Sequence, residues 1–595
     1  MSEKTYIKGK DRDLESTIET MLQKLADIGI EIEEASSINP VPNVYSVHIR
    51  DKDCELMFTN GKGATEKASF ASALGEYFER LSCNYFFADF YLGEEFGKEE
   101  FVHYPDERWF KVTGEAESAA IPDGLLDEGL WDYYDPEKEL KSHHLFDVNS
   151  GAGADTNNLA DCRGICALPY HRLRDGETLW FPVNVIGNIY VSNGMSAGNT
   201  KNEARVQGLS EVFERYIKNR IISEGICLPE IPRDVLERFP KIIQAIDELE
   251  GHDYHLRIAD ASLGGKYPVM SVTLMNPRDA SVYASFGAHP SFEVALERTV
   301  TELLQGRGLH ELDGFSPPSL DLEEVADHHN LETHFIDSSG LIAYDFFKDK
   351  PDYEFYDWDH DANNADEFEY LSRLIHEMGF DIYIAEYEHL NVYSCRIIVP
   401  GMSDIYPVDD LLWNNNNEGA LFREDILSLR DLDKAQWQAL YDRLEDGAYH
   451  DMQRVAEFIG VAPDRGTVWA GLRIGELKAM LCLAVGDLDN AANWIDWCLH
   501  MDQLTVCRLH IYNCLQVLLE IKQDDSRDYD DYADGLNKLY GKEYVSICSK
   551  VLDGREVFHG LHSPGLSLEG FELHNELLKG YRKLHKFKQL NWGKK

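Results

Sequence analysis

The feature that most constrains the fold of this chain is a motif that occurs twice, at residues 59–80 and 192–215. Each copy is a Gly-rich stretch followed by a helix-forming stretch that ends in Glu-x-Phe-Glu-Arg. A third unit, at residues 286–305, has the same order of turn and helix. Because strand-forming runs recur beside these units, the repeat predicts an α/β or α+β fold built from strand–turn–helix units.

The two glutamates of each motif stand three residues apart: Glu76 and Glu79 in the first copy, Glu211 and Glu214 in the second. Residues i and i+3 share one helix face, so each pair points at one target. Apolar neighbours such as Phe78 indicate that these faces are buried. Buried carboxylates need a cation or hydrogen-bond donors, and an oxygen-only ligand set favours Mg²⁺ or Ca²⁺ over Zn²⁺.

The neighbouring arginines and turns extend the metal hypothesis to a nucleotide. Arg80 and Arg215 directly follow the glutamates, and Arg298 belongs to the third unit. Gly-rich turns and helix N-termini bind phosphates, and the sequence has no G-x-x-x-x-G-K-[ST], which excludes a P-loop. The pattern indicates a magnesium–nucleoside triphosphate site without a Walker motif. The alternative is a set of structural ion pairs, which for Arg298 means a salt bridge to Glu302.

Charge and composition exclude several other classes of protein. The chain carries 57 Lys+Arg against 106 Asp+Glu, a net charge of −49, so we expect no nucleic-acid partner and no anionic membrane surface. No secretory signal and no membrane-spanning apolar run is visible, and the 11 scattered cysteines are typical of the cytoplasm. Cys162 and Cys166 have no second Cys or His pair at zinc spacing, so we do not expect them to form a structural zinc site.

The composition changes after Pro407, where strand patterns give way to helical ones. Strands are expected at residues 44–50, 54–58, 183–191, 269–274, 282–286, 382–385 and 395–399. Helix pairs are expected at residues 476–484 with 490–499 and at 508–522 with 528–540. We therefore expect an α+β domain over residues 1–425 and an all-α domain over residues 426–595. Small residues at the helix contacts resemble a tetratricopeptide array, with an ordinary helical bundle as the alternative.

The repeated motifs resemble those of the YcaO family, together with the segments at residues 297–308 and 398–407. The resemblance extends over the whole chain and implies a YcaO-type domain that binds ATP and Mg²⁺. It places the Mg²⁺ ligands at Glu76, Glu79, Glu203, Glu211 and Glu214. It places the nucleotide contacts at Lys10, Thr17, Arg80, Ser196, Asn199, Gln207, Arg215 and Arg298. No catalytic residue is assigned, and His289 in the third unit is interpreted as structural.

The family also implies what the site does. Azoline- and thioamide-forming members phosphorylate a backbone amide oxygen, and many of them end in a Pro-rich tail. This chain ends Leu-Asn-Trp-Gly-Lys-Lys, which favours the relatives with a tetratricopeptide-like tail. Those relatives are accessory factors for β-methylthiolation of an aspartate in the twelfth small-subunit ribosomal protein. The resemblance therefore implies an ATP-hydrolysing homodimer with a methylthiotransferase partner. The alternatives are a peptide cyclodehydratase and a nucleotide-regulated scaffold with little turnover.

Overall fold

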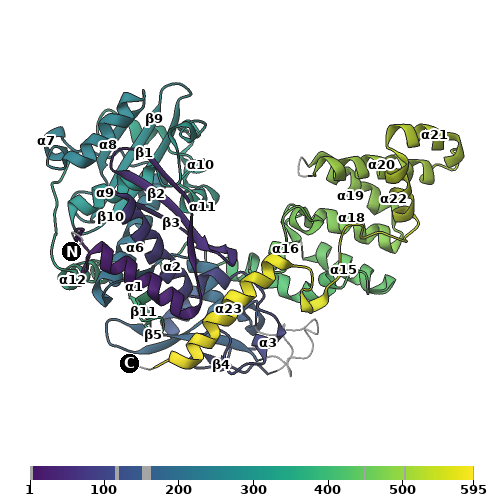
Figure 1. The fold of residues 1–595 in the computed structure, drawn as a ribbon, viewed down its shortest axis with the longest axis horizontal. Helices are drawn as coiled ribbons and strands as arrows, with labels where there is room; N and C mark the ends of the chain where they lie inside the picture. The colour runs from purple at the N-terminus through teal and green to yellow at the C-terminus, as the bar shows by residue number, and fades with distance from the viewer. Residues whose placement is uncertain (1–3, 114–118, 150–162, 448, 502–503, 594–595) are drawn as a thin grey trace.

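The computed structural model describes residues 4–113, 119–149, 163–447, 449–501 and 504–593. Within these ranges, one part of the chain combines helices with three antiparallel sheets, and a helical part extends from it (Figure 1). This is the α+β fold that the sequence predicts, followed by the predicted helical C-terminal part.

The first sheet has the order β1-β2-β3, formed by Ile32–Val41, Val44–Asp51 and Cys54–Gly63. The second has the order β10-β9-β8, formed by Ser281–Ala288, Val269–Asn276 and His255–Asp260. The third has the order β4-β5-β11-β12-β7, formed by Arg108–Phe110, Ile165–Arg172, Tyr383–Tyr387, Tyr393–Ile398 and Met195–Gly198. Its remaining strand, β6 (Thr178–Pro182), pairs with β5. Six of the seven strands expected from the sequence are confirmed.

Three strand–turn–helix units form the centre of the α+β part. They are β3 with α2 (Glu66–Ser82), β7 with α6 (Lys201–Glu224), and β10 with α9 (Phe292–Leu303). Equivalent threonines cap the first two helices: Thr65 Oγ1 accepts from Ala68 N at 3.1 Å and Thr200 Oγ1 from Glu203 N at 3.2 Å. Each helix packs on its own strand and on the next unit's strand, α2 on β7, α6 on β10 and α9 on β3. The internal repeat therefore closes into a ring of three units.

The glycines of the first repeat do not form the turn that the sequence suggests. Gly61 and Gly63 lie inside β3, and the turn comes at the next two residues. A Cβ atom on Gly61 would lie 2.0 Å from the backbone oxygen of Ser69 and 2.4 Å from the nitrogen of Ala73. Glycine is required there because α2 lies directly against the strand, so the pattern reflects close helix–strand packing.

The expected strand at residues 183–191 is wrong. The chain instead forms α5 (Val183–Val185), followed by a π-helical turn over Ile186–Tyr190. Asn188 Nδ2 donates to the Asn184 oxygen at 2.9 Å, and Asn188 Oδ1 accepts from Asn416 N at 2.9 Å. A short apolar run fits a buried strand and a buried helix equally well, and these asparagine contacts appear only in the folded chain.

The helical part consists of helices that pack mostly on near neighbours along the chain. Its main helices are α15 (Lys434–Asp446), α18 (Ile474–Val485), α19 (Leu488–His500), α20 (Val506–Gln523), α21 (Tyr529–Leu539) and α22 (Lys542–Leu552). Packing runs from α15 to α18, α19 and α20, and then from α20 to α22. The helices of both predicted pairs are present, and α18 packs on α19 as expected, whereas α20 packs more extensively on α22 than on α21. None of the described helices is both long and apolar enough to span a bilayer.

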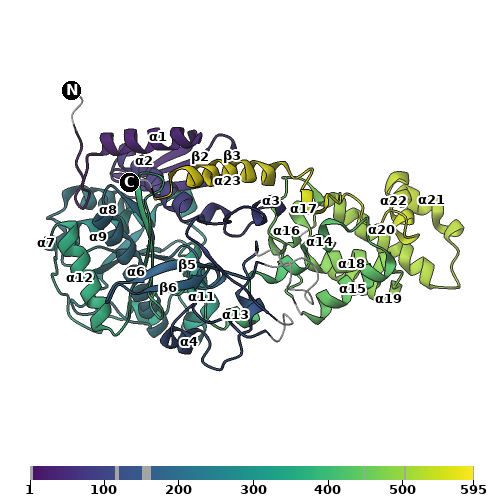
Figure 2. The ribbon, with the colours of Figure 1, turned by 90° about the horizontal axis from the view of Figure 1, so that it is seen from below.

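The last helix, α23 (Glu572–Asn591), returns to the α+β part, where it lies beside α1 (Leu14–Ile28) and β3 (Figures 1 and 2). A Cβ atom on Gly580 would lie 2.6 Å from Met57 Sδ of β3, and His574 Nε2 lies 2.8 Å from the Tyr91 oxygen. One hydrophobic core runs from Met21 through this contact into the helical part. The domain boundary after residue 425 stays a prediction.

Candidate nucleotide and metal site

The two Glu-x-x-Glu-Arg motifs have the same local geometry on α2 and α6. Arg80 Nη2 donates to Glu76 Oε1 at 3.1 Å, and Arg215 Nη2 lies 3.1 Å from Glu211 Oε1. Each guanidinium also lies 4.4 Å from the centre of an aromatic ring, that of Tyr85 for Arg80 and that of Phe335 for Arg215. The sequence repeat is therefore also a repeat of side-chain contacts.

The acids of the two motifs act on one another. Burial raises the pKa of Glu79 well above its usual range; Arg80 opposes this shift, and the charges of Glu211 and Glu76 add to it. Burial likewise raises the pKa of Glu214, against the charges of nearby lysines. The structure thus brings Glu76, Glu79, Glu211 and Glu214 into one electrostatic cluster between α2 and α6. Partly buried carboxylates this close together need cations or hydrogen-bond donors.

Two lysines beside this cluster were not identified from the sequence. Burial lowers the pKa of Lys62 to about 8, although Glu214 and Glu76 favour its charged form. Its ammonium forms an ion pair with Glu302 of α9. Burial also lowers the pKa of Lys218 to about 8, while its Nζ donates to the His334 oxygen at 2.6 Å. Lys62 lies between Gly61 and Gly63 of β3, inside the first repeated motif. That position was the sequence feature that could have identified Lys62 as a site residue.

A second group of predicted residues gathers at the N-terminus of α6. Glu203 is buried, and its carboxylate lies 3.4 Å from Lys10 Nζ and accepts from Asp11 N at 2.9 Å. Asn199 Nδ2 donates to the same carboxylate at 3.2 Å, and Thr17 Oγ1 donates to Asn199 Oδ1 at 2.9 Å. The structure therefore joins Lys10, Thr17, Asn199 and Glu203.

The two groups are separate. Glu203 and Glu211 stand eight residues apart on α6, which is about 12 Å along the helix. One ion cannot contact both groups, whereas an extended triphosphate with its metal ions can span them. Gln207 lies between them, and its Oε1 accepts from Arg298. Gln207 and Arg298 therefore link the two groups.

Arg298 does not form the salt bridge to Glu302 that was its structural alternative, because Glu302 pairs with Lys62. Its guanidinium donates to Gln207 and, at 3.3 Å, to the Ala288 oxygen, both of which are neutral acceptors. Burial lowers the pKa of Arg298, and Glu214 opposes the shift most strongly. A buried guanidinium that bonds only neutral oxygens is suited to an anionic ligand.

The remaining predicted residues have clear structural positions. Ser196 is buried on β7, with its Oγ 3.3 Å from Cys395 Sγ and beneath α6 at Gly208. The structure thus places Ser196 under the helix, beside Cys395. His289 Nδ1 accepts from Ser291 N at 3.0 Å, and burial lowers the pKa of His289 well below its usual range. His289 is therefore a neutral, structural residue, as expected.

The fit to Mg²⁺ follows from charge more than from ligand geometry. Glu76 and Glu211 are each paired with an arginine. Among the described residues, the group of three potential metal ligands whose ligand atoms lie within 4.8 Å of one another is outside this acid cluster. Burial nevertheless raises the pKa values of Glu79 and Glu214. In addition, Arg215 Nη1 is buried without a hydrogen-bond acceptor. Mg²⁺ and phosphate oxygens would satisfy these groups, so the residues fit a magnesium nucleotide.

A cavity of about 340 Å³ opens at Arg215, beyond the glutamates on α6. Its other lining includes Gly401, Met402 and Asp404. Burial raises the pKa of Asp404 to about 6. This cavity adjoins the acid cluster and contains part of the segment at residues 398–407.

The profile described as "YcaO cyclodehydratase, ATP- and Mg²⁺-binding" matches residues 60–403, and that of the YcaO cyclodehydratase C-terminal domain matches residues 419–590. The chain therefore belongs to the YcaO family, and ATP and Mg²⁺, the cofactors expected from the sequence, are those of the family.

Two relatives match over their full lengths. The ribosomal protein S12 methylthiotransferase accessory factor YcaO of Escherichia coli is 53% identical over 99% of this chain and 100% of its own chain. An uncharacterized protein of Haemophilus influenzae is 51% identical over 100% of both chains. The solved YcaO structure from Methanopyrus kandleri, bound with AMPPCP and Mg²⁺, has 17% identity and a TM-score of 0.42. The match covers 68% of this chain and 95% of the Methanopyrus kandleri chain.

Proposed function

We propose that this protein binds ATP with Mg²⁺ along α6, between the acid cluster and the Glu203 group. The observation that carries the proposal is the pair of equivalent motifs on α2 and α6, in which Arg80 pairs with Glu76 and Arg215 with Glu211. The raised pKa values of Glu79 and Glu214 support it. Glu76, Glu79, Glu211 and Glu214 would hold metal at one end and Glu203 at the other. Arg298 and Gln207 would contact the phosphates between them. Bound Mg²⁺ neutralises charge that develops on a transferring phosphoryl group.

We further propose that nucleotide binding serves β-methylthiolation of an aspartate in ribosomal protein S12, with the protein acting as an accessory factor. The support is the full-length similarity to the factor of that name. The alternatives are ATP-dependent activation of a peptide amide, as the family description of cyclodehydratase suggests, and a nucleotide-regulated scaffold.

The helical part is proposed as a tetratricopeptide-like platform for a methylthiotransferase. Its helices α18, α19, α20 and α22 pack in succession and extend away from the sheets (Figure 1). A Cβ atom on Gly475 would lie 2.6 Å from the Trp497 ring, so a small residue permits the close contact of α18 with α19. We also propose that the protein is a homodimer, which light scattering tests. We propose a cytoplasmic location, which the free thiols of the described cysteines fit.

The test combines binding, turnover and modification. Glu211→Gln should weaken ATP binding at fixed Mg²⁺ by about 1–3 kcal/mol, the value of a lost charged contact. Glu66→Gln, at the exposed start of α2, is the matched control and should bind like the parent. Phosphate release with and without the methylthiotransferase measures turnover, and mass spectrometry of S12 from a complemented deletion strain measures modification.

The outcomes separate the alternatives. Unchanged ATP affinity in Glu211→Gln contradicts its assignment as a metal ligand. Restored S12 modification without measurable phosphate release favours the scaffold, and ATP-dependent loss of water from a peptide substrate favours the cyclodehydratase. A strain whose S12 stays unmodified with the parent protein rules out the accessory role.

A further inference from the structure

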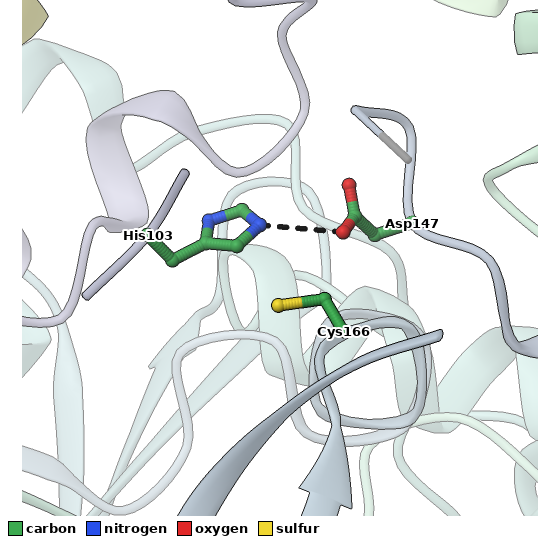
Figure 3. A group of neighbouring side chains, drawn as sticks. All are labelled: His103, Asp147 and Cys166. Carbon is green, nitrogen blue, oxygen red and sulfur yellow. Dashed lines mark hydrogen bonds and ion pairs between the residues drawn. The ribbon is translucent and has the colours of Figure 1, made fainter. Parts of the chain in front are cut away.

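A second cluster of potential metal ligands lies outside the nucleotide site. His103 comes from the loop before β4, Asp147 follows the short helix Ser142–Leu145, and Cys166 lies on β5. Figure 3 shows the three side chains directed at one another. His103 Nε2 lies 3.3 Å from Asp147 Oδ2, and the ligand atoms of all three residues lie within 4.8 Å of one another.

This cluster is buried. Cys166 is 1% exposed and Asp147 is 6% exposed. It therefore differs from acidic groups on the surface, which solvent stabilises without an ion. Nitrogen, oxygen and sulfur donors together match a borderline-soft ion such as Zn²⁺ and do not match Mg²⁺.

The distances agree with a tetrahedral centre. Bonds of 2.0–2.3 Å to a tetrahedral zinc ion separate neighbouring ligand atoms by about 3.3–3.8 Å. The His103–Asp147 separation of 3.3 Å already has that value. The Cys166 sulfur needs a shift of about 1 Å at most, which a small side-chain rotation supplies.

The backbone around His103 is fixed before any ion binds. The Glu107 carboxylate accepts from the backbone nitrogens of Val102 and His103 at 2.7 Å and from that of Tyr104 at 3.0 Å. The His103 oxygen accepts from Lys588 Nζ of α23 at 2.9 Å. Such outer contacts orient metal ligands, and here they connect the cluster to the C-terminal helix.

The site also has space for an ion. His103 and Asp147 line a cavity of about 60 Å³, which leaves room for a fourth, non-protein ligand.

We propose that His103, Asp147 and Cys166 bind one Zn²⁺ ion, with a fourth coordination position open to the cavity beside α23. Cys162, the other cysteine of the spaced pair, lies outside the described residues. The simpler alternative is a His103–Asp147 ion pair beside a neutral thiol, with no metal.

The test uses the full-length protein, stripped with a chelator and then loaded with Zn²⁺ or Co²⁺ in the presence of Mg²⁺ and ATP. We expect about one ion per chain by elemental mass spectrometry, and a thiolate-to-cobalt charge-transfer band. Cys166→Ser should abolish the band and weaken binding at least about tenfold, in the range for altered metal ligation. Cys498→Ser, which changes a buried cysteine of α19, is the matched control and should keep the band.

Asp147→Asn and His103→Gln keep side-chain size and should each lower the cobalt affinity, with circular dichroism and ATP binding as the checks of folding. If Cys166→Ser does not fold, the charge-transfer band of the parent protein and the cobalt affinities of Asp147→Asn and His103→Gln test the proposal instead. A parent protein that takes up no ion with a sulfur signature overturns the proposal, and so does a band that persists in Cys166→Ser.

Discussion

Replacing Arg298 by Lys tests whether the third unit of the ring contacts phosphate. The substitution keeps the positive charge and removes the planar fork that contacts two oxygens at once. In the structure that fork donates to Gln207 and Ala288, and no carboxylate of the described residues forms an ion pair with it. Arg298→Lys therefore leaves no ion pair to break in the protein without nucleotide.

The magnitude follows from the bond that is lost. A hydrogen bond to a charged group is worth about 1.5–3 kcal/mol, which corresponds to a ten- to roughly hundredfold weaker affinity for Mg-ATP. Isothermal titration calorimetry at saturating Mg²⁺ measures this change. The melting temperature without nucleotide should stay close to that of the parent, and the stabilisation by a fixed ATP concentration should shrink.

Arg307→Lys is the matched control, because Arg307 lies just beyond α9 and donates to Tyr283 and to the Asp337 oxygen. This variant should bind ATP like the parent. Parental ATP affinity in Arg298→Lys would refute the reasoning and leave α9 as scaffold for a site made by α2 and α6. A large fall in melting temperature without nucleotide would instead mean that the fork holds α9 to α6.

Three other predictions concern charge, packing and the C-terminal helix. Because the folded pKa of Glu79 is raised, its contribution to stability is present at low pH and is lost as pH rises through that pKa. The melting temperature of Glu79→Gln without nucleotide should therefore exceed the parent's by a margin that grows as the pH rises above the usual range of a glutamate pKa, and a constant margin would contradict this. Gly61→Ala should destabilise by about 1–3 kcal/mol in chemical denaturation, because its Cβ meets the backbone of α2. Gly75→Ala on the same helix has open space around the Cβ and should stabilise by about 0.5–1 kcal/mol, so equal effects would contradict the packing argument. Ending the chain after residue 425 removes α23 from β3 and should lower the melting temperature and the ATP-induced shift together, whereas full retention of both would show that residues 1–425 fold independently.

The sequence predicted the parts of the site that repeat. Glu76 with Arg80 and Glu211 with Arg215 follow helical spacing, and their contacts on α2 and α6 are local. Lys62 was missed because its contact with Glu302 joins strands and helices of different units. The division of the glutamates into two groups was also missed, since a shared helix face does not reveal the distance along it.

The fold was predictable where periodicity is unambiguous. Helices α18 and α19 lie within two residues of the ranges that their apolar spacing predicts. The run at residues 183–191 was not predictable, because a short apolar segment does not distinguish a strand from a buried helix. The return of α23 depends on contacts between residues more than 450 positions apart, such as those of His574 and Tyr91. No local pattern contains that information.

The return of α23 changes how the helical part is expected to influence the nucleotide site. β3 carries Lys62, which faces the acid cluster, and Met57, which contacts α23 at Gly580. One strand therefore packs against both the nucleotide-site helix α2 and the helix that closes the chain. A partner that binds α18–α22 and shifts α23 would move β3, and with it the ammonium of Lys62. Because that ammonium lies beside Glu76 and Glu214, a shift in β3 changes the charge balance that Mg²⁺ and ATP meet. A partner on the helical part would thus have a physical route, through the single strand β3, to the proposed nucleotide site.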